Sequence, residues 1–129
     1  MIAVDTNIVV RFLIADDPRQ AALAQQCMTE GAFVSAGVLM ETEWVLRSSF
    51  GLPRQRLAEL LHDLIEVASV EFEDRDQLRR AVGRYRRGAD WADLLHLIAA
   101  RAHGRFATFD RDLSRDAGKD APTSIEVLQ

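Results

Sequence analysis

Four acidic residues occupy positions from which chain-end geometry could bring their carboxylates together: Asp5, Glu41, Asp93 and Asp110. Each follows an apolar run typical of a strand or falls in the first turns of a helical segment. In a parallel α/β sheet the carboxyl ends of the strands lie along one edge, so these side chains could gather there. Gathered carboxylates repel one another, and a fold tolerates them when a hard divalent cation neutralises the charge. The pattern therefore indicates a Mg²⁺ or Mn²⁺ site and phosphate-ester chemistry.

Each of these acids also has an ordinary structural interpretation. Asp5 could make local hydrogen bonds in a turn, and Asp110 could cap the short helix that follows it. Asp90 is a good N-cap, and Asp93 would complete something like a capping box. The same spacing of three residues places Asp90 and Asp93 on one side of a helix start. We assign Asp93 as a ligand and Asp90 as a second acid or cap, since the common placement of all the acids favours a site.

Either of two glutamates could be the acid that the helix from Val38 through Leu46 contributes to the site. Glu41 and Glu43 are two residues apart, so they point to different sides of a helix and only one can readily face a shared site. Glu41 lies amid the apolar residues 38–40, whereas Glu43 can pair with Arg47 at i+4. We therefore assign Glu41 to the site and Glu43 to a salt bridge.

The elements that must position these acids alternate along the chain. Apolar runs predict strands at Ile2–Val4, Phe33–Ser35, Val70–Phe72, Phe106–Phe109 and Ser124–Leu128. Helical periodicity and capping signals predict helices through Arg11–Ile14 (capped by Asn7), from Pro18 to about Glu30, from Val38 through Leu46, at Arg54–Ala68, from Asp74 to about Arg87, and at Trp91–His103 and Arg111–Ala117. This alternation predicts one α/β domain, residues 1–129, with a parallel sheet and helices on both faces.

Composition limits the classes of protein that the chain can belong to. A hydrophobic fraction of 48% is ample for a packed core. The net charge of −4 argues mildly against a nucleic-acid binder. That objection weakens if several acids bind a cation, because the ion reverses the local field. Lys119 is the only lysine, so arginine supplies almost all the positive charge, and arginine suits bidentate phosphate contacts.

Several features point to a soluble cytoplasmic protein. Cys27 is the only cysteine, so it cannot form an internal disulfide, and its helical surroundings predict a small core residue. The start MIAVDTN has no basic region typical of a signal peptide. No apolar run reaches the length of a membrane span, so no membrane partner is expected.

Histidines and tryptophans add little to the site. None of the histidines has zinc-like spacing: His62, His96 and His103. His96, three residues after Asp93, could orient a carboxylate, although a surface or packing role is the stronger interpretation. Trp44 and Trp91 lie on apolar helix faces, so we predict core packing rather than base stacking for both.

Five segments carry a resemblance to a known family: IAVDTNIVVRFL, DDPRQAALA, VLMETEWVLRSSFG, GADWADLLHLIAA and FATFDRDLSRDA. Together they resemble a PIN domain, and specifically a VapC-type toxin ribonuclease of a type II toxin–antitoxin system. The resemblance covers nearly the whole chain, with the segments in the expected order. It departs mainly at GADWADLL, where Leu94 stands in place of a frequent alanine, which we expect to affect packing rather than chemistry.

The resemblance implies a three-layer α/β/α domain with a central, mainly parallel sheet. It implies an acidic quartet that binds Mg²⁺ or Mn²⁺: Asp5, Glu41, Asp93 and Asp110. It implies possible outer acids at Asp90 and Asp112 and a polar supporting shell at Thr6, Asn7 and Thr108.

The implied activity is metal-assisted hydrolysis of an RNA phosphodiester, with Asp93 or Asp110 accepting the proton of the attacking water. Transfer, ribosomal and messenger RNA are all open as substrates. The arginine-rich helix near residues 75–87 either holds the RNA backbone or forms a solvated face. The resemblance also implies a homodimer and a VapB-type antitoxin, with residues 8–14 and 38–68 as plausible docking segments.

Two rival interpretations remain. A catalytically silent PIN-like module that binds RNA or protein would suit the same fold, but the intact quartet argues against it. An aspartyl-phosphate protein of haloacid-dehalogenase or response-regulator type needs either DxD after the first strand or an acidic pair with a later lysine. Here Asp5 is followed by Thr6 and Asn7, and the only lysine is Lys119. No GxxxxGK or GxGxxG occurs, which excludes the common nucleotide-binding loops.

Overall fold

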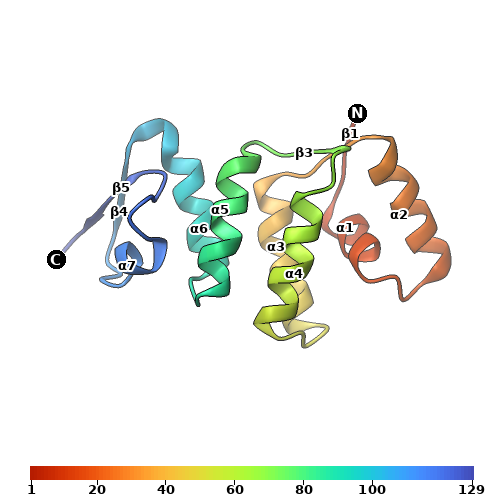
Figure 1. Ribbon diagram of the computed structural model, residues 1–129, viewed down its shortest axis with the longest axis horizontal. Helices are drawn as coiled ribbons and strands as arrows, with labels where there is room; N and C mark the ends of the chain where they lie inside the picture. Colours follow the sequence, from red (N-terminus) through yellow and green to blue (C-terminus); the bar gives the residue numbers. More distant parts are fainter. The chain divides into compact units, whose positions relative to one another are not determined.

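The chain forms two compact units in the computed structural model, which describes all residues from Met1 to Gln129. The first unit is Met1–Arg75 and the second is Asp76–Gln129. Helices and short strands alternate in both (Figure 1). Every strand pairs with a parallel neighbour. The predicted α/β class with parallel strands is therefore confirmed.

A three-stranded parallel sheet organises the first unit. Its strands are β1 (Ile2–Ala3), β2 (Ala32–Phe33) and β3 (Val70–Glu71), hydrogen-bonded in the order β1-β2-β3. The pairing continues one residue past the strands, because the Val4 amide donates to Phe33 O at 3.1 Å and the Val34 amide to Glu71 O at 3.0 Å. The sheet therefore ends where Asp5 begins the next element.

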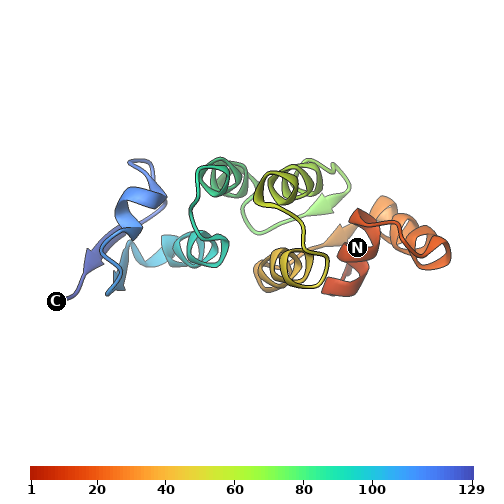
Figure 2. The same ribbon diagram turned by 90° about the horizontal axis from the view of Figure 1, so that it is seen from below.

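Four helices surround this sheet: α1 (Thr6–Leu13), α2 (Pro18–Glu30), α3 (Ala36–Ser48) and α4 (Arg54–Ile65). The start of α2 is as predicted, because the Asp17 carboxylate accepts from the Gln20 amide at 3.1 Å and Pro18 is the first helical residue. Figure 2 shows α1 beside α2 and α3 beside α4. The strand predicted for Phe33–Ser35 ends at Phe33, since Ser35 caps α3 by accepting from the Val38 amide at 3.2 Å.

The amphipathic character predicted for α4 is confirmed. Its apolar stripe is buried: Leu57, Ala58, Leu60, Leu61, Leu64 and Ile65. The helix ends at Ile65 rather than Ala68, because the Val67 amide turns back to Leu64 O at 3.2 Å.

Arg75 donates hydrogen bonds to carbonyl oxygens that have no helical partner at the end of α4. Its guanidinium donates to Ile65 O, to Val67 O at 3.2 Å and to Val70 O. The same group lies 5.1 Å from the centre of the Phe72 ring. Arg75 thus fastens the last turn of α4 to β3 at the end of the first unit.

The second unit contains α5 (Arg75–Arg86), which Arg75 begins, α6 (Trp91–Ala99), the 3₁₀ helix η1 (Ala100–His103) and α7 (Leu113–Ala117). Trp91 packs edge-on against Tyr85, with ring centres 5.7 Å apart, and this pair joins α6 to α5. The helix predicted for Trp91–His103 tightens to 3₁₀ geometry at Ala100 and ends at Gly104, whose φ is 73°.

Two parallel strands complete this unit: β4 (Arg105–Thr108) and β5 (Ser124–Val127), with α7 between them in the chain. A small core lies beneath them, formed by Leu97, Leu113 and Ala117 with Phe106, Ala121 and Ile125. Across the strands, Arg105 Nε donates to Glu126 at 3.0 Å. This pairing lowers the pKa of Glu126.

Two arginines of α5 hold the segment around α7. Arg84 donates to Asp116 O at 2.9 Å and to Arg115 O at 3.1 Å, and Arg80 donates to Ala117 O and to the Asp120 carboxylate. The Arg80 hydrogen bond lowers the pKa of Asp120. Part of the arginine-rich helix is therefore structural rather than a solvated face.

Two packing predictions are corrected. Trp91 is 1% exposed, as expected of a core residue, but Trp44 is 56% exposed. Cys27 is half-buried rather than in the core. Both residues belong to helix faces whose apolar stripes are broken by polar neighbours, so periodicity overstated their burial. None of the helices is both long and apolar enough to span a bilayer.

Candidate active site

Asp5 begins α1. Its backbone is extended, with φ −92° and ψ 177°, and Oδ1 accepts from the Ile8 amide at 3.1 Å. Asp5 is therefore the N-cap, and the prediction that Asn7 caps this helix is wrong. Asn7 lies inside the first turn, where helical backbone geometry prevents it from capping. The cap uses one carboxylate oxygen of Asp5 and leaves Oδ2 available to another partner.

Glu41 lies beside the start of α1. Its side chain on α3 is exposed, rather than enclosed by the apolar residues near it in the sequence. Its Oε1 accepts a hydrogen bond from the hydroxyl of Thr6, which is 7% exposed. This contact joins residues 35 apart and puts Glu41 at the end of α1 that Asp5 caps.

Glu43 has the structural role that the sequence predicts. Its side chain is buried, and its carboxylate accepts from Arg47 Nε at 2.9 Å and from Arg47 Nη2 at 3.4 Å. The predicted i, i+4 salt bridge is confirmed.

Asp90 and Asp93 stand together at the start of α6. Asp90 caps the helix by accepting from the Asp93 amide at 3.0 Å. The pKa of Asp93 is raised first by burial, then by the negative charges of Asp90 and Asp110, with a smaller contribution from Asp116; His96 opposes the rise. His96 is exposed, as the stronger interpretation predicts, although its side chain still acts electrostatically on Asp93. Asp116 is a neighbour that the sequence did not reveal.

Asp110 follows β4 and is fixed by local hydrogen bonds. Its amide donates to Thr108 Oγ1 at 3.0 Å, and its Oδ1 accepts from the Asp112 amide at 2.9 Å. Asp112 itself is the N-cap residue of α7 and forms an ion pair with Arg115 at 3.4 Å. Asp110 therefore makes the local hydrogen bonds that a purely structural role requires. These bonds leave Oδ2 of its carboxylate available to another partner.

The donor set suits a hard divalent cation. Asp93 and Asp110 are close enough to repel each other, and neither forms an ion pair with a basic side chain. Asp5 and Glu41 are oxygen donors at the end of α1. No three His, Cys, Asp or Glu side chains are arranged to hold a metal ion by themselves. Two of the four acids belong to each unit, and the convergence of all four stays a prediction.

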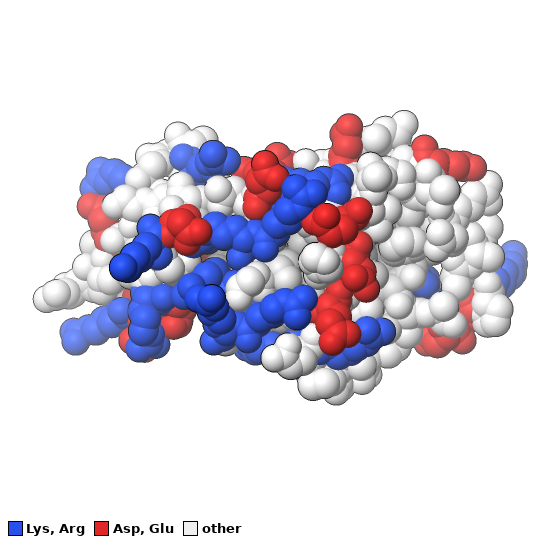
Figure 3. Space-filling model, viewed as in Figure 1, with Lys and Arg blue, Asp and Glu red and all other residues white.

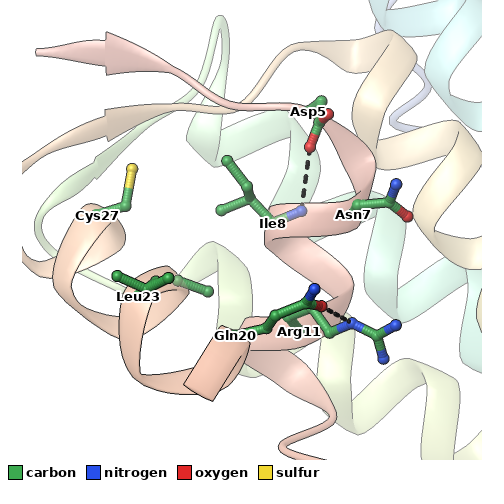
Figure 4. Close-up of a pocket in the computed structure, with 8 residues that line it drawn as sticks. Asp5, Asn7, Ile8, Arg11, Gln20, Leu23 and Cys27 are labelled. Atoms are coloured by element: carbon green, nitrogen blue, oxygen red, sulfur yellow. Dashed lines mark hydrogen bonds between the residues drawn. The ribbon is translucent and has the colours of Figure 1, made fainter. Parts of the chain in front are cut away.

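A pocket of about 500 Å³ opens next to Asp5, between α1 and α2. Figure 4 shows Asp5 at one end and the Gln20–Arg11 hydrogen bond at the other. The remaining lining residues are Asn7, Ile8, Leu23, Ala24 and Cys27. The sequence does carry a signal for it, because four lining residues recur at helical spacing on α2: Gln20, Leu23, Ala24 and Cys27.

Positive charge is concentrated in the second unit. Residues 76–129 contain ten Arg or Lys and eight Asp or Glu, whereas residues 1–75 contain six and twelve. Figure 3 shows Lys and Arg side chains gathered over helices α5 to α7. Arg80 and Arg84 are engaged with the α7 segment, whereas Arg86 and Arg87 are exposed. The surface of this unit can therefore attract an anion despite the negative charge of the whole chain.

The comparison with protein families identifies one match. The model of the PIN domain matches residues 2–119 and so runs through both units. No curated protein and no solved structure matches the chain. The helices and parallel strands are consistent with a PIN-like α/β/α fold, and a nuclease-like function is what this family suggests. The chain belongs to the PIN domain family.

Proposed function

We propose that this protein is a Mg²⁺- or Mn²⁺-dependent endoribonuclease that hydrolyses RNA phosphodiester bonds. The observation that carries the proposal is the repeated placement of acids next to parallel strands. Asp5 follows β1 and caps a helix beside Glu41, and Asp110 follows β4 and acts electrostatically on Asp93. Such strand ends are where open α/β sheets place their sites.

Four carboxylates would hold the cation in this proposal: Asp5, Glu41, Asp93 and Asp110. Thr6 would orient Glu41 through the hydrogen bond that it donates, and Thr108 would fix the backbone of Asp110. Asn7, Asp90 and Asp112 would belong to the surrounding polar shell. A bound divalent cation supplies activation of water and neutralisation of charge on the phosphate.

Asp93 or Asp110 would accept the proton of the attacking water in this proposal. The two carboxylates lie close enough for the charge of Asp110 to act on Asp93, so both are near the same position. In the proposed reaction, the water oxygen attacks phosphorus and one of these two carboxylates takes the proton of the water. The bond from phosphorus to the leaving ribose oxygen breaks, and that oxygen takes up a proton from solvent. Arg86 and Arg87, which are exposed, would hold the flanking phosphates.

We propose further that the protein is a VapC-type toxin. This role would give it a VapB-type antitoxin as its inhibitor, a homodimeric form and a cytoplasmic setting, with transfer, ribosomal or messenger RNA as the target. The five sequence segments that resemble such toxins support this assignment, as does the family match.

Incubating purified protein with total RNA tests the proposal. We expect cleavage into discrete fragments with Mg²⁺ or Mn²⁺, none in excess EDTA, and none with Asp5→Asn. Cleavage that persists in EDTA would contradict the role of the metal. Absence of both cleavage and Mn²⁺ binding in calorimetry would favour the silent binding module instead.

Variants of the predicted acids locate the site. Glu41→Gln and Asp93→Asn should each lower the cleavage rate at least about 100-fold, because each removes a charged ligand. Circular dichroism should show that the variants remain folded. Full activity in either variant would remove that residue from the site.

A further inference from the structure

The pocket between α1 and α2 has more binding groups than the proposed hydrolysis uses. Of the residues that line it, only Asp5 has a proposed ligand role, with Asn7 in the polar shell around it. A volume of about 500 Å³ falls within the range of sites that bind small organic groups. The pocket therefore has room for a substrate group next to the reacting phosphate.

Hydrogen-bond donors dominate one end of this pocket. Arg11 Nε donates to Gln20 Oε1 at 2.9 Å, and Arg11 Nη1 donates to Asp16 Oδ1 at 2.8 Å. These two bonds fix the guanidinium plane and leave Nη2 without a partner in the chain. The amide nitrogen of Gln20 and the side chain of Asn7 are also without partners. A ligand that presents acceptors would satisfy these donors.

One wall between the donor end and Asp5 is apolar. Ile8, Leu23, Ala24 and Cys27 form it, and Leu23 is 58% exposed despite being a leucine on a helix that packs against α1. Figure 4 shows Ile8 and Leu23 lying between the two helices. A flat ring placed in the pocket would cover this wall while its edge met the donors.

We propose that this pocket binds an unpaired guanine base of the substrate RNA, next to the phosphate that is cleaved. Guanine presents O6 and N7 as paired acceptors, for which the free Nη2 of Arg11 and the amide nitrogen of its partner Gln20 supply one donor each. Proteins commonly read single-stranded RNA by taking splayed bases into such sites. The inference rests on the proposed ribonuclease function and adds a base preference to it, because Asp5 belongs to both the pocket and the predicted catalytic site.

The single cysteine gives a direct test that needs no catalysis. Cys27 lines the pocket, is half-buried and is the only thiol in the chain. Its alkylation by iodoacetamide can be followed by mass spectrometry of the intact chain in EDTA, with each 5′-mononucleotide at millimolar concentration. GMP should slow alkylation several-fold, and AMP, CMP and UMP should slow it less. Equal rates with and without all four nucleotides would overturn the proposal.

Variants separate the pocket from general effects on α2. Gln20→Leu removes an amide at nearly constant size, and Arg11→Lys keeps the charge but loses the planar fork, so both should weaken protection by GMP. Gln25→Leu is the matched control, because Gln25 bonds Thr29 on the same helix outside the pocket. Undiminished GMP protection in both pocket variants would count against guanine recognition.

Cleavage assays make the two proposals separable. Protection by GMP without RNA cleavage would uphold the pocket and reject the nuclease, whereas cleavage without protection would do the reverse. If both hold, end-mapping should find guanine next to the cut sites of the wild-type protein, and Gln20→Leu should lose that preference.

Discussion

The charge of Asp93 opposes folding in the absence of a cation. Its folded-state pKa is raised above the ordinary value, so folding favours the protonated form. The metal-free protein should therefore lose part of its stability as the pH rises through the carboxyl range. Asp93→Asn should remove this component and raise the free energy of unfolding near pH 7 by less than about 1 kcal/mol, since water screens a partly exposed group.

Urea unfolding of wild type and Asp93→Asn in EDTA, between pH 4 and pH 7, measures this effect. The difference between the two proteins isolates Asp93 from carboxylates such as Asp120, whose pKa is shifted downward. A stability difference that did not grow with pH would mean that repulsion at α6 is negligible.

Glu43 and Glu41 should separate stability from activity. Glu43 is buried and paired with Arg47, so Glu43→Gln should lower the free energy of unfolding by about 1 kcal/mol and retain most RNA cleavage. Glu41 is exposed, so Glu41→Gln should change stability little and abolish cleavage. Thermal melts and cleavage assays on both variants check this contrast. Loss of activity in Glu43→Gln alone would show that the catalytic glutamate was assigned wrongly.

The two tryptophans differ in burial and should differ in energetic importance. Trp91→Ala should cost about 3–5 kcal/mol, because it removes a buried ring that packs on Tyr85. Trp44→Ala should cost less than about 1 kcal/mol, since more than half of that side chain is exposed. Chemical denaturation of the two variants gives both numbers. Equal costs would contradict the exposure of Trp44.

At the level of elements, the sequence predicts most helices and strands because local signals decide them. Asp17-Pro18 and Gly31 delimit α2 at the predicted residues, and all five strands occur where apolar runs were found. The predicted end residues are wrong where a side chain caps a helix and so changes where the neighbouring element begins or ends. Ser35 ends β2 early by capping α3, and Asp5 takes the cap that was assigned to Asn7.

The candidate site is less predictable, because its contacts join residues distant in the chain. The hydrogen bond from Thr6 to Glu41 has no local signal in the sequence. The influence of Asp116 on Asp93 likewise depends on how α7 folds back towards α6. Residue type and spacing indicated which acids to consider, but not the partners that tune them.

The link from α5 to α7 should control the local stability of Asp110's surroundings. Arg84→Gln removes hydrogen bonds to the carbonyls of residues 115 and 116, so the amides of residues 112–118 should exchange faster with deuterium. Arg86→Gln, on the same helix but exposed, is the control and should leave this exchange unchanged. Unchanged exchange in Arg84→Gln would mean that the α7 segment is held by its apolar core alone.

At the scale of the whole chain, the uneven charge should govern RNA binding. The second unit has a net charge of +2 and the first −6, so RNA phosphates should be attracted mainly to the second. Replacing both Arg86 and Arg87 by Gln should weaken binding and reduce the slope of log K against log salt by about 0.7 for every phosphate that is no longer neutralised.

Fluorescence anisotropy of a labelled single-stranded RNA in EDTA, over a salt series, measures this slope. Arg19→Gln in the first unit is the control. It removes one positive charge, as each of the two substitutions in the second unit does, and it should leave the slope almost unchanged. An equal fall per charge in both units would show that RNA does not distinguish them.

The hydrogen bonds of Arg75 should affect where trypsin cleaves the chain. The border between the two units falls directly after this arginine, where trypsin would be expected to cut a flexible hinge. Its guanidinium, however, is held by three carbonyl oxygens and lies over Phe72, so it is not free to enter a protease pocket. Limited trypsin digestion should therefore spare the border while it cuts at exposed basic residues elsewhere, such as Arg86, Arg111 and Lys119, so that an early fragment spans the border.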